Sequence, residues 1–219
     1  KIINPKYIIG ENVPGLLKRK TVSGELYINV ITNEFINLGY RIYTKVMKCN
    51  LHGIPQNRQR LIIVGIKNNI DKNFEFPEED NNKKNLKDII KFSMEGTIKI
   101  DKEDFDYSKI PEECILKNME NNEIESDPHP NLVNLAKKRD YEYKGVKYPQ
   151  RLTFGKRIPV GGEVIDIRKP INTIICTYSR QPRFFIIQQN QNGYYLRCLL
   201  PNELKQIQSF PANYKICGN

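Results

Sequence analysis

The chain has 219 residues and a mass of 25.6 kDa, and its 39% hydrophobic content and mean hydropathy of -0.58 argue against a disordered or collagen-like protein. No apolar run approaches the roughly 18 to 20 residues of a membrane span, and the first residues lack the layout of a secretory signal, so a cytoplasmic protein without a membrane partner is expected. The five cysteines are odd in number, widely spaced and without a C-x-x-C pair, so neither a disulfide scaffold nor a metal site is predicted.

Charge is distributed unevenly along the chain. The net charge of +10 divides into +8 over residues 1–70, -8 over residues 71–127 and +10 over residues 128–219. Basic flanks of this kind favour a polyanion, because neutralising phosphates releases condensed counterions, and the acidic insert is then expected to face away from it. A solvated lysine-rich surface is the alternative, and charge alone does not decide between the two.

The first third of the chain alternates element types. Strands are predicted at residues 6–9, 41–49 and 61–66. The first is expected to be buried and to place Glu11 at its carboxyl end, before a Pro/Gly loop. A helix capped by Ser23 and stopped near Gly39 separates it from the other two strands, which are expected to pair antiparallel. Three strands and one helix cannot cover both faces of a parallel sheet, so a sheet partner is expected from elsewhere.

The remainder of the chain is predicted to hold short elements. Residues 68–150 read mainly as an acidic insert or linker, and the segment from Arg151 as a small β-rich domain. Pro201 suits the first position of a closing helix. Short helices are predicted within residues 86–92 and 131–140, and strands at residues 164–167, 173–177 and 184–187.

Three segments in this order carry a family resemblance. The first is P-K-Y-x-x-x-E-N-V over residues 5–13, and the second is a strand, a G-x-P-Q-x-R-x-R loop and a strand over residues 39–66. The third is R-x-L-x-x-x-E-x-x-x-x-Q-x-F-P over residues 197–211. Together they resemble the carboxyl-terminal portion of bacterial-type DNA cytosine-5 methyltransferases.

The resemblance implies a fold class and a division into domains. The expected fold is α/β, the carboxyl-terminal part of a Rossmann-like, S-adenosylmethionine-dependent methyltransferase sheet with a small β-rich target-recognition domain. Residues 1–67 would form the second half of the catalytic domain, residues 68–190 the variable insert and target-recognition domain, and residues 191–219 a return helix toward the catalytic domain. The implied cofactor is S-adenosylmethionine, with no residue here assigned to bind it, and the implied partner is double-stranded DNA.

The resemblance also implies roles for individual residues. Glu11 would be the acid that binds or protonates N3 of a flipped cytosine, and Arg60 would contact that base. Gln56 and Arg58 would brace the site and the sugar-phosphate backbone, with Arg58 and Arg60 on one side of a strand. Thr173 would face the phosphate beside the flipped base. Further candidates for contact with DNA are Lys156, Arg157, Arg168, Lys169, Arg180 and Arg183. Arg197 and Glu203 are expected to hold the two domains together.

The sequence departs from the family pattern in two places that bear on activity. It contains neither the F-x-G-x-G cofactor loop nor the Pro-Cys-Gln loop of the nucleophile, and Cys49 and Cys198 are predicted to be buried small hydrophobic residues. The chain alone is therefore expected to be inactive, and to need an amino-terminal segment from the same gene or from a separate subunit. The alternatives are a non-catalytic module that binds duplex DNA and a basic α/β domain with fortuitous matches.

Overall fold

The computed structural model describes residues 3–80, 84–120, 126–137, 140–211 and 213–215, and it divides into two compact units. Unit 1 comprises Lys1–Gly53 and Asn57–Lys83, and unit 2 comprises Ile54–Gln56 and Lys84–Asn219. The tripeptide Ile54–Gln56 thus belongs to unit 2, although both of its flanks belong to unit 1. No helix in the described ranges is long and apolar enough to cross a membrane.

Unit 1 is built on a three-stranded sheet in the order β1-β3-β2. Its strands are β1 (Tyr7–Asn12), β2 (Tyr40–Lys48) and β3 (Gln59–Lys67), and both pairings are antiparallel. The predicted antiparallel pairing of the second and third strands is confirmed. A 3₁₀ turn, η1 (Pro14–Lys18), follows β1, and another, η2 (Cys49–Leu51), follows β2.

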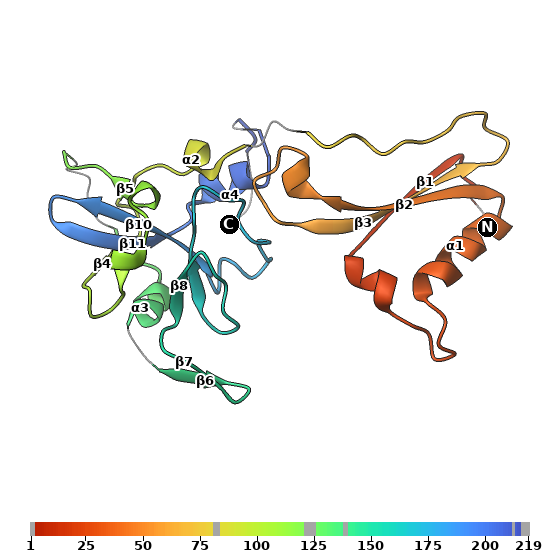
Figure 1. Ribbon diagram of the computed structural model, residues 1–219. Helices are drawn as coiled ribbons and strands as arrows, with labels where there is room; N and C mark the ends of the chain where they lie inside the picture. Colours follow the sequence, from red (N-terminus) through yellow and green to blue (C-terminus); the bar gives the residue numbers. More distant parts are fainter. Residues whose placement is uncertain (1–2, 81–83, 121–125, 138–139, 212, 216–219) are drawn as a thin grey trace. The chain divides into compact units, whose positions relative to one another are not determined.

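The helix of unit 1, α1 (Tyr27–Asn37), runs along one side of the sheet (Figure 1). The predicted cap at Ser23 is wrong: the helix begins after Leu26, without a side-chain cap, and the Ser23 hydroxyl is hydrogen-bonded to that of Thr21. The predicted stop near Gly39 is confirmed, because α1 ends at Asn37. Gly39 adopts a φ of 81°, and its N–H donates a hydrogen bond to the carbonyl of Ile36.

The two faces of the unit 1 sheet differ. One face packs Leu61 and Ile63 against Ile28 of α1, and Gly65 there lets Ile8 cross closely. On the other face, Ile9 is 79% exposed and Tyr7 is 51% exposed. The prediction that the first strand is buried is therefore wrong, because β1 is an edge strand of this sheet with one uncovered side.

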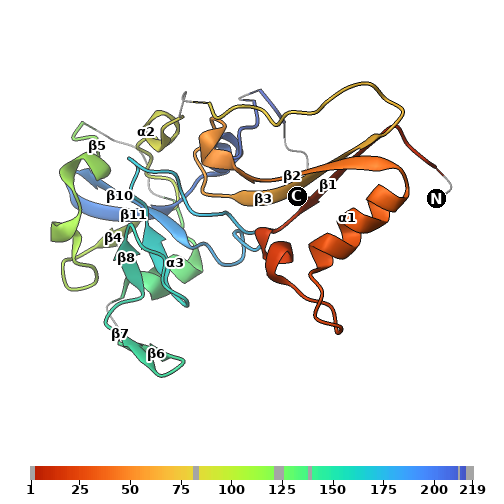
Figure 2. The same cartoon turned by 45° about the vertical axis from the view of Figure 1, so that its right-hand side comes forward.

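Unit 2 contains a mixed sheet in the order β4-β11-β10-β9-β8, with β5 also paired to β10. Its strands are β4 (Ile98–Ile100), β5 (Leu116–Lys117), β8 (Leu152–Phe154), β9 (Gly162–Val164), β10 (Phe184–Asn190) and β11 (Gly193–Cys198). A separate hairpin, β6 (Tyr141–Tyr143) and β7 (Val146–Tyr148), projects from the rest of unit 2 in both views (Figures 1 and 2).

Short helices complete unit 2. They are α2 (Leu86–Ile89), α3 (Pro130–Ala136) and α4 (Pro201–Ile207), with 3₁₀ turns η3 (Tyr107–Lys109) and η4 (Glu112–Cys114). All three helices were predicted, and Pro201 is the first residue of α4 as expected. The core gathers around β10, whose Phe184, Phe185, Ile186 and Ile187 are at most 2% exposed.

Some predictions for unit 2 fail. Residues 173–177 form no strand, and the short strands β4 to β7 lie in a region that was read as insert. The expected strand at residues 164–167 is displaced to β9, which ends at Val164. These strands are only two or three residues long. A strand this short does not span enough residues for the alternation of apolar and polar side chains to be recognised in the sequence.

The closing part of the chain lies in unit 2. The return helix predicted within residues 191–219 is α4, and it shares unit 2 with residues 84–190. The reason is packing: Leu196, Leu199 and Ile207 are at most 4% exposed and belong to the core of unit 2. The return of this helix toward a catalytic domain stays a prediction.

The cysteines whose surroundings are described are free thiols in different settings. Cys114 and Cys198 are packed into unit 2, where burial raises the pKa of each thiol to about 11. Cys49 lies in η2 instead of a strand and is only partly buried, and Cys176 is exposed. Cys217 lies outside the described residues.

Candidate active site

Glu11 stands at the end of β1, next to last in the strand, where the sequence predicted it. In the register of the sheet Glu11 lies opposite Ile62 of β3, so Arg60, two residues away on β3, is its diagonal neighbour on the same face. Side chains related in this way are within reach of each other when they are long. The strand pairing of unit 1 therefore brings two of the predicted site residues together.

The two side chains form an ion pair. Arg60 Nε lies 2.5 Å from Glu11 Oε1, and the side chains are 23% and 54% exposed, respectively. Arg60 also donates from Nη1 to the carbonyl of Gln59 at 2.7 Å, which fixes one end of the guanidinium. The carboxylate is thus held in place by a partly buried arginine while more than half of it remains open to solvent. An exposed, oriented carboxylate of this kind can accept a hydrogen bond from a ligand.

Arg58 is placed less specifically. It lies just before β3, which begins at Gln59, so the two arginines are not both within the strand as predicted. The described contact of Arg58 is through its backbone, whose carbonyl accepts from the N–H of Cys49 at 2.8 Å. Its role toward DNA stays a prediction.

Gln56 belongs to unit 2 and is only 2% exposed. It forms an isolated parallel bridge with Ile171, and the N–H of Ile171 donates to the carbonyl of Pro55 at 3.0 Å. This pairing brings the Pro-Gln segment beside the stretch that contains Thr173, another predicted site residue. Because the Gln56 side chain is buried, it is suited to bracing that stretch and has little surface to offer DNA.

The basic residues predicted to contact DNA fall into two groups. Arg168 is engaged inside unit 2, with Nε 2.8 Å from Asp166 Oδ1 and Nη1 2.7 Å from Glu113 Oε1. Lys169 also pairs with Asp166, at 3.2 Å. These contacts neutralise the two cations and hold the pKa of Asp166 well below its usual range, chiefly through its hydrogen bonds to Arg168.

The second group is not engaged in this way. Among the residues that the structure describes, no ion pair at 4 Å or less involves Lys156, Arg157, Arg180 or Arg183. Arg183 donates from Nη1 to the carbonyl of Pro159 at 3.3 Å, which leaves most of its guanidinium donors available. These four residues remain the better candidates for contact with a polyanion.

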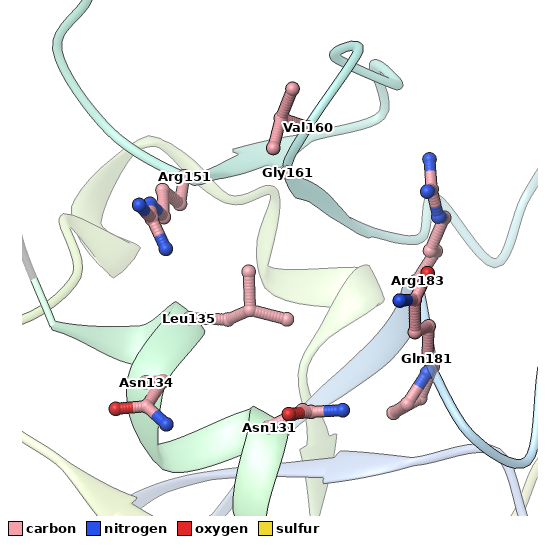
Figure 3. Close-up of a pocket in the computed structure, with 9 residues that line it drawn as sticks. Asn131, Asn134, Leu135, Arg151, Val160, Gly161, Gln181 and Arg183 are labelled. Atoms are coloured by element: carbon pink, nitrogen blue, oxygen red, sulfur yellow. The ribbon is translucent and has the colours of Figure 1, made fainter. Parts of the chain in front are cut away.

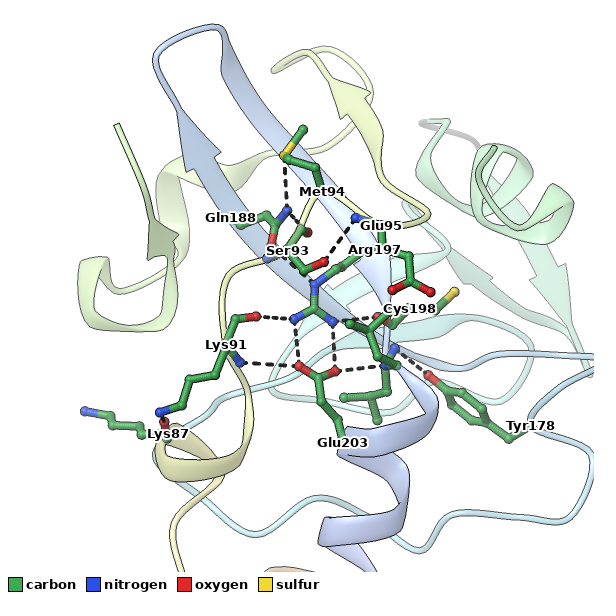
Figure 4. Close-up of polar contacts among 12 residues, drawn as sticks. Lys87, Lys91, Ser93, Met94, Glu95, Tyr178, Gln188, Arg197, Cys198 and Glu203 are labelled. Carbon is green, nitrogen blue, oxygen red and sulfur yellow. Dashed lines mark hydrogen bonds and ion pairs between the residues drawn. The ribbon is translucent and has the colours of Figure 1, made fainter. Parts of the chain in front are cut away.

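Arg197 and Glu203 form a buried bidentate pair (Figure 4). Both guanidinium-to-carboxylate distances are 2.8 Å, and the side chains are 0% and 7% exposed. Arg197 also donates to the carbonyls of Lys91 and Cys198, and the N–H of Leu200 donates to Glu203 at 2.9 Å. All of these partners belong to unit 2, so the pair joins β11, α4 and the segment after α2 within one unit, instead of joining two domains as expected.

Sequence reasoning missed two groups of polar residues. The Cys114 thiol donates to Asp166 Oδ1 at 3.3 Å, beside the bonds from Arg168, although Cys114 is far from both residues in the sequence. Arg151, Asn131 and Gln181 line one cavity but come from three segments without a shared motif. Within the described ranges no group of three His, Cys, Asp or Glu side chains could hold a metal ion.

The family model for C-5 cytosine-specific DNA methylases matches residues 1–219, which is the whole chain. The chain belongs to this family. It is 27% identical to the type II methyltransferase M.MthTI of Methanothermobacter thermautotrophicus over 96% of its own length and 57% of that protein. It is also 37% identical to M.BspRI of Lysinibacillus sphaericus over 35% of its length and 17% of that protein. This methylase family member therefore spans little more than half the length of M.MthTI.

Among solved structures, the fold is similar to that of DNMT2 from Spodoptera frugiperda. The similarity has a TM-score of 0.55 and covers 100% of this chain and 60% of that one, at 12% sequence identity. At this level of identity the likeness supports the mixed α/β fold over the whole length of the family member.

Proposed function

We propose that this methylase family member supplies the acid and arginine side of the active site of a DNA cytosine-5 methyltransferase. The reaction transfers a methyl group from S-adenosylmethionine to C5 of a cytosine that is flipped out of duplex DNA. The observation that carries the proposal is the Glu11–Arg60 pair, which the register of β1 and β3 assembles on the face of the sheet opposite α1.

Methylation at C5 of cytosine requires an acid and a hydrogen-bond donor beside the base, which such a pair can supply. Methylation of an aromatic ring carbon requires electrons to be pushed into the ring, which a thiolate does by adding at C6 while an acid stabilises the opposite side of the ring. After the methyl group has reached C5, the C5 proton is lost to a base and the C6–S bond breaks, which restores the ring and the thiolate. In the proposed mechanism, the Glu11 carboxyl donates to N3 of cytosine and accepts from the neighbouring amino group, while Arg60 holds that carboxyl and donates to the carbonyl oxygen of the base. Both contacts strengthen as negative charge develops on the ring.

Unit 2 is proposed to act as the target-recognition domain. Its unpaired arginines and lysines would contact the phosphates, and the segment at Ile171 and Thr173, braced by Gln56, would lie along the strand that carries the flipped base. The acidic stretch of residues 71–127 would face away from DNA, as its charge suggests.

The methyl donor would supply an electrophilic methyl group, and we assign no residue of this chain to hold it, because the sequence contains no F-x-G-x-G loop. The nucleophile is proposed to come from an amino-terminal segment, in the same polypeptide or a separate subunit. β1 is an edge strand of the sheet, and its free edge is where such a segment would add. The segment could also cover the exposed Tyr7 and Ile9 side chains.

The test is methyl transfer from labelled S-adenosylmethionine to mixed-sequence duplex DNA. We expect activity when the chain is mixed with an amino-terminal fragment that carries the two missing loops. Glu11→Gln should then lower the rate by about 10² to 10⁴, because it removes an acid at the reacting base. Glu25→Gln, which removes an exposed carboxylate of the same unit, is the matched control and should leave the rate unchanged.

The competing reading is a non-catalytic module that binds duplex DNA, which the net charge of +10 favours. Salt-sensitive binding without methyl transfer in any mixture would support that module and contradict the enzyme. Loss of duplex affinity in Glu11→Gln would contradict the role assigned to Glu11.

A further inference from the structure

Unit 2 contains an open cavity of about 520 Å³ between α3, the start of β8 and two loops. Figure 3 shows Arg151 and Arg183 on opposite sides of it and Leu135 of α3 pointing into it. The remaining lining residues are Asn131, Asn134, Val160, Gly161, Gln181 and Pro182. The lining thus contains two guanidinium groups and three carboxamide side chains, and no carboxylate.

The charge of this cavity is not balanced locally. Within the described ranges no ion pair at 4 Å or less involves Arg151 or Arg183. Arg168 of the same unit shows the contrast, since Asp166 and Glu113 bind it on two sides. Two cations that share a cavity without a carboxylate repel each other, so the site favours an anionic ligand.

Arg151 carries a further sign of a missing partner. Its Nε is buried and has no hydrogen-bond partner in the described structure. Leaving such a donor unsatisfied in the folded protein is unfavourable. A ligand oxygen can reach the buried Nε only if the guanidinium turns toward the cavity, and that turn would relieve the unsatisfied donor. Its guanidinium lies 5.6 Å from the centre of the Tyr141 ring, so the side chain is held against the β6–β7 hairpin.

The rest of the cavity is preorganised. Asn131 donates from Nδ2 to the carbonyl of Arg180 at 2.8 Å, which ties α3 to the loop before β10. The carbonyl of Arg151 lies where a Cβ of residue 161 would have to be, so Gly161 is needed for the two loops to approach. Arginine and carboxamide groups fixed in this way are the donors that proteins use on phosphate oxygens.

We propose that Arg151 and Arg183 clamp one backbone phosphodiester of bound DNA in this cavity, with the deoxyribose against Leu135 and Val160. The carboxamides of Asn131 and Gln181 would donate to the remaining phosphate oxygens. The identity of the nucleic acid as DNA rests on the proposed function, whereas the preference for a phosphodiester rests on the cavity itself. Arg151 is thereby assigned a positioning role that sequence reading did not give it.

The test is the affinity of the 219-residue chain for mixed-sequence duplex DNA over a series of salt concentrations, measured by fluorescence anisotropy. Arg151→Gln and Arg183→Gln together should weaken binding by about tenfold or more on every sequence, since hydrogen bonds to charged groups are removed. The slope of log affinity against log salt should also fall by about 0.9, the value for one phosphate. Lys99→Gln and Lys102→Gln together, an equal charge change at two exposed positions outside the cavity, are the control.

A conservative variant separates geometry from charge. Arg151→Lys should keep the salt slope and still lose affinity, because an ammonium cannot make two parallel bonds to one phosphate. An unchanged affinity and slope in the double variant would overturn the clamp, as would a loss confined to some sequences, which is the mark of a base contact. Absence of salt-sensitive binding by the unaltered chain would overturn it as well.

A footprint on the unaltered chain does not depend on how the variants fold. Duplex DNA should protect Arg151 and Arg183 from phenylglyoxal and leave the modification of Arg168 unchanged. Equal protection by inorganic phosphate at the same phosphate concentration would reveal a site for the free ion and overturn the assignment to DNA. Methyl transfer is a separate readout: if it fails in every mixture while this protection and the slope change persist, the proposed function falls and the clamp stands.

Discussion

Each unit contains an arginine–glutamate ion pair, and the two pairs differ in how far they are exposed to solvent. In unit 2, Arg197 and Glu203 are almost completely buried, and every oxygen of the carboxylate is bonded. In unit 1, Arg60 and Glu11 are partly open to solvent, at 23% and 54% exposure. The comparison teaches that the pair in unit 2 serves the architecture, because removing either partner leaves a buried charge, whereas the pair in unit 1 keeps a carboxylate available to a ligand.

The cores around the two pairs differ in the same sense. The buried cluster of unit 1 consists, in the described residues, of Ile28, Leu61 and Ile63 with partly buried neighbours. The cluster of unit 2 extends from α2 through β10 to α4 and includes the fully buried Phe185 and Leu196. The larger apolar core of unit 2 can therefore offset the desolvation of a buried charge pair, whereas the small core of unit 1 cannot.

The largest effect is expected at the buried pair. Arg197→Met should lower the free energy of unfolding by about 3–5 kcal/mol, because it leaves the Glu203 carboxylate buried without its cation. Urea unfolding followed by circular dichroism measures this change. Replacing both residues, as Arg197→Met with Glu203→Leu, should recover part of the loss. A single variant as stable as the unaltered chain would refute the structural role.

A smaller effect is expected in the core of unit 1. A Cβ on residue 65 would lie 2.6 Å from Cδ1 of Ile8 and 3.0 Å from Cδ1 of Ile42. Gly65→Ala should therefore lower the free energy of unfolding by about 1–3 kcal/mol, because β1 has to move away from β3. Thermal unfolding measures it, with Gly15→Ala, whose Cβ would meet only Val13 at 3.9 Å, as the control. Equal melting temperatures would contradict the close crossing.

The Asp166–Arg168 pair predicts a dependence on acid. The pKa of Asp166 is lower in the folded chain than in the unfolded chain, where it is about 3.9. The ionised carboxylate therefore stabilises unit 2 at any pH above that unfolded pKa. That contribution is lost as the pH falls from this value toward the folded pKa. Urea midpoints measured between neutral pH and acid should show this loss, and Asp166→Asn should flatten it. A variant with the same acid dependence as the unaltered chain would exclude Asp166 as the cause.

The smallest effect is expected at the proposed catalytic pair. Glu11→Gln and Arg60→Gln should each change the free energy of unfolding by only about 0 to 1 kcal/mol, because exposed ion pairs contribute little. The same urea titration measures this. A loss comparable to that of Arg197→Met would show that both pairs serve the architecture.

Sequence reasoning performed best where elements are long and worst where they are short. Strands β2 and β3 each have nine residues. Both were predicted from runs of β-branched and aromatic residues, and the single loop between them predicted that they pair antiparallel. The apolar run at residues 173–177 failed as a strand, because after the parallel bridge at Ile171 the chain enters turns in which Tyr178 caps the carbonyl of Phe184. Such a contact depends on tertiary packing, which no local pattern records.

The candidate site was predictable in part, because two of its residues belong to motifs at the ends of recognisable strands. Glu11 and Arg60 were found through their motifs, and the strand register explains why they meet. The exposure of β1 was missed, because an apolar run looks alike whether or not its outer face is covered. Of the residues that line the cavity at Arg151, the sequence indicated only Arg183, because the lining comes from separate segments that no shared motif connects.

The path of the chain through Ile54–Gln56 has a consequence for biosynthesis. These three residues leave the ribosome together with β2 and β3, whereas Ile171, to which Gln56 pairs, is made much later. The hairpin of β2 and β3 can close early around a loop that has no partner yet. We therefore expect the Pro-Gln loop to be the last part of the hairpin to acquire protection from hydrogen exchange, only after unit 2 has folded.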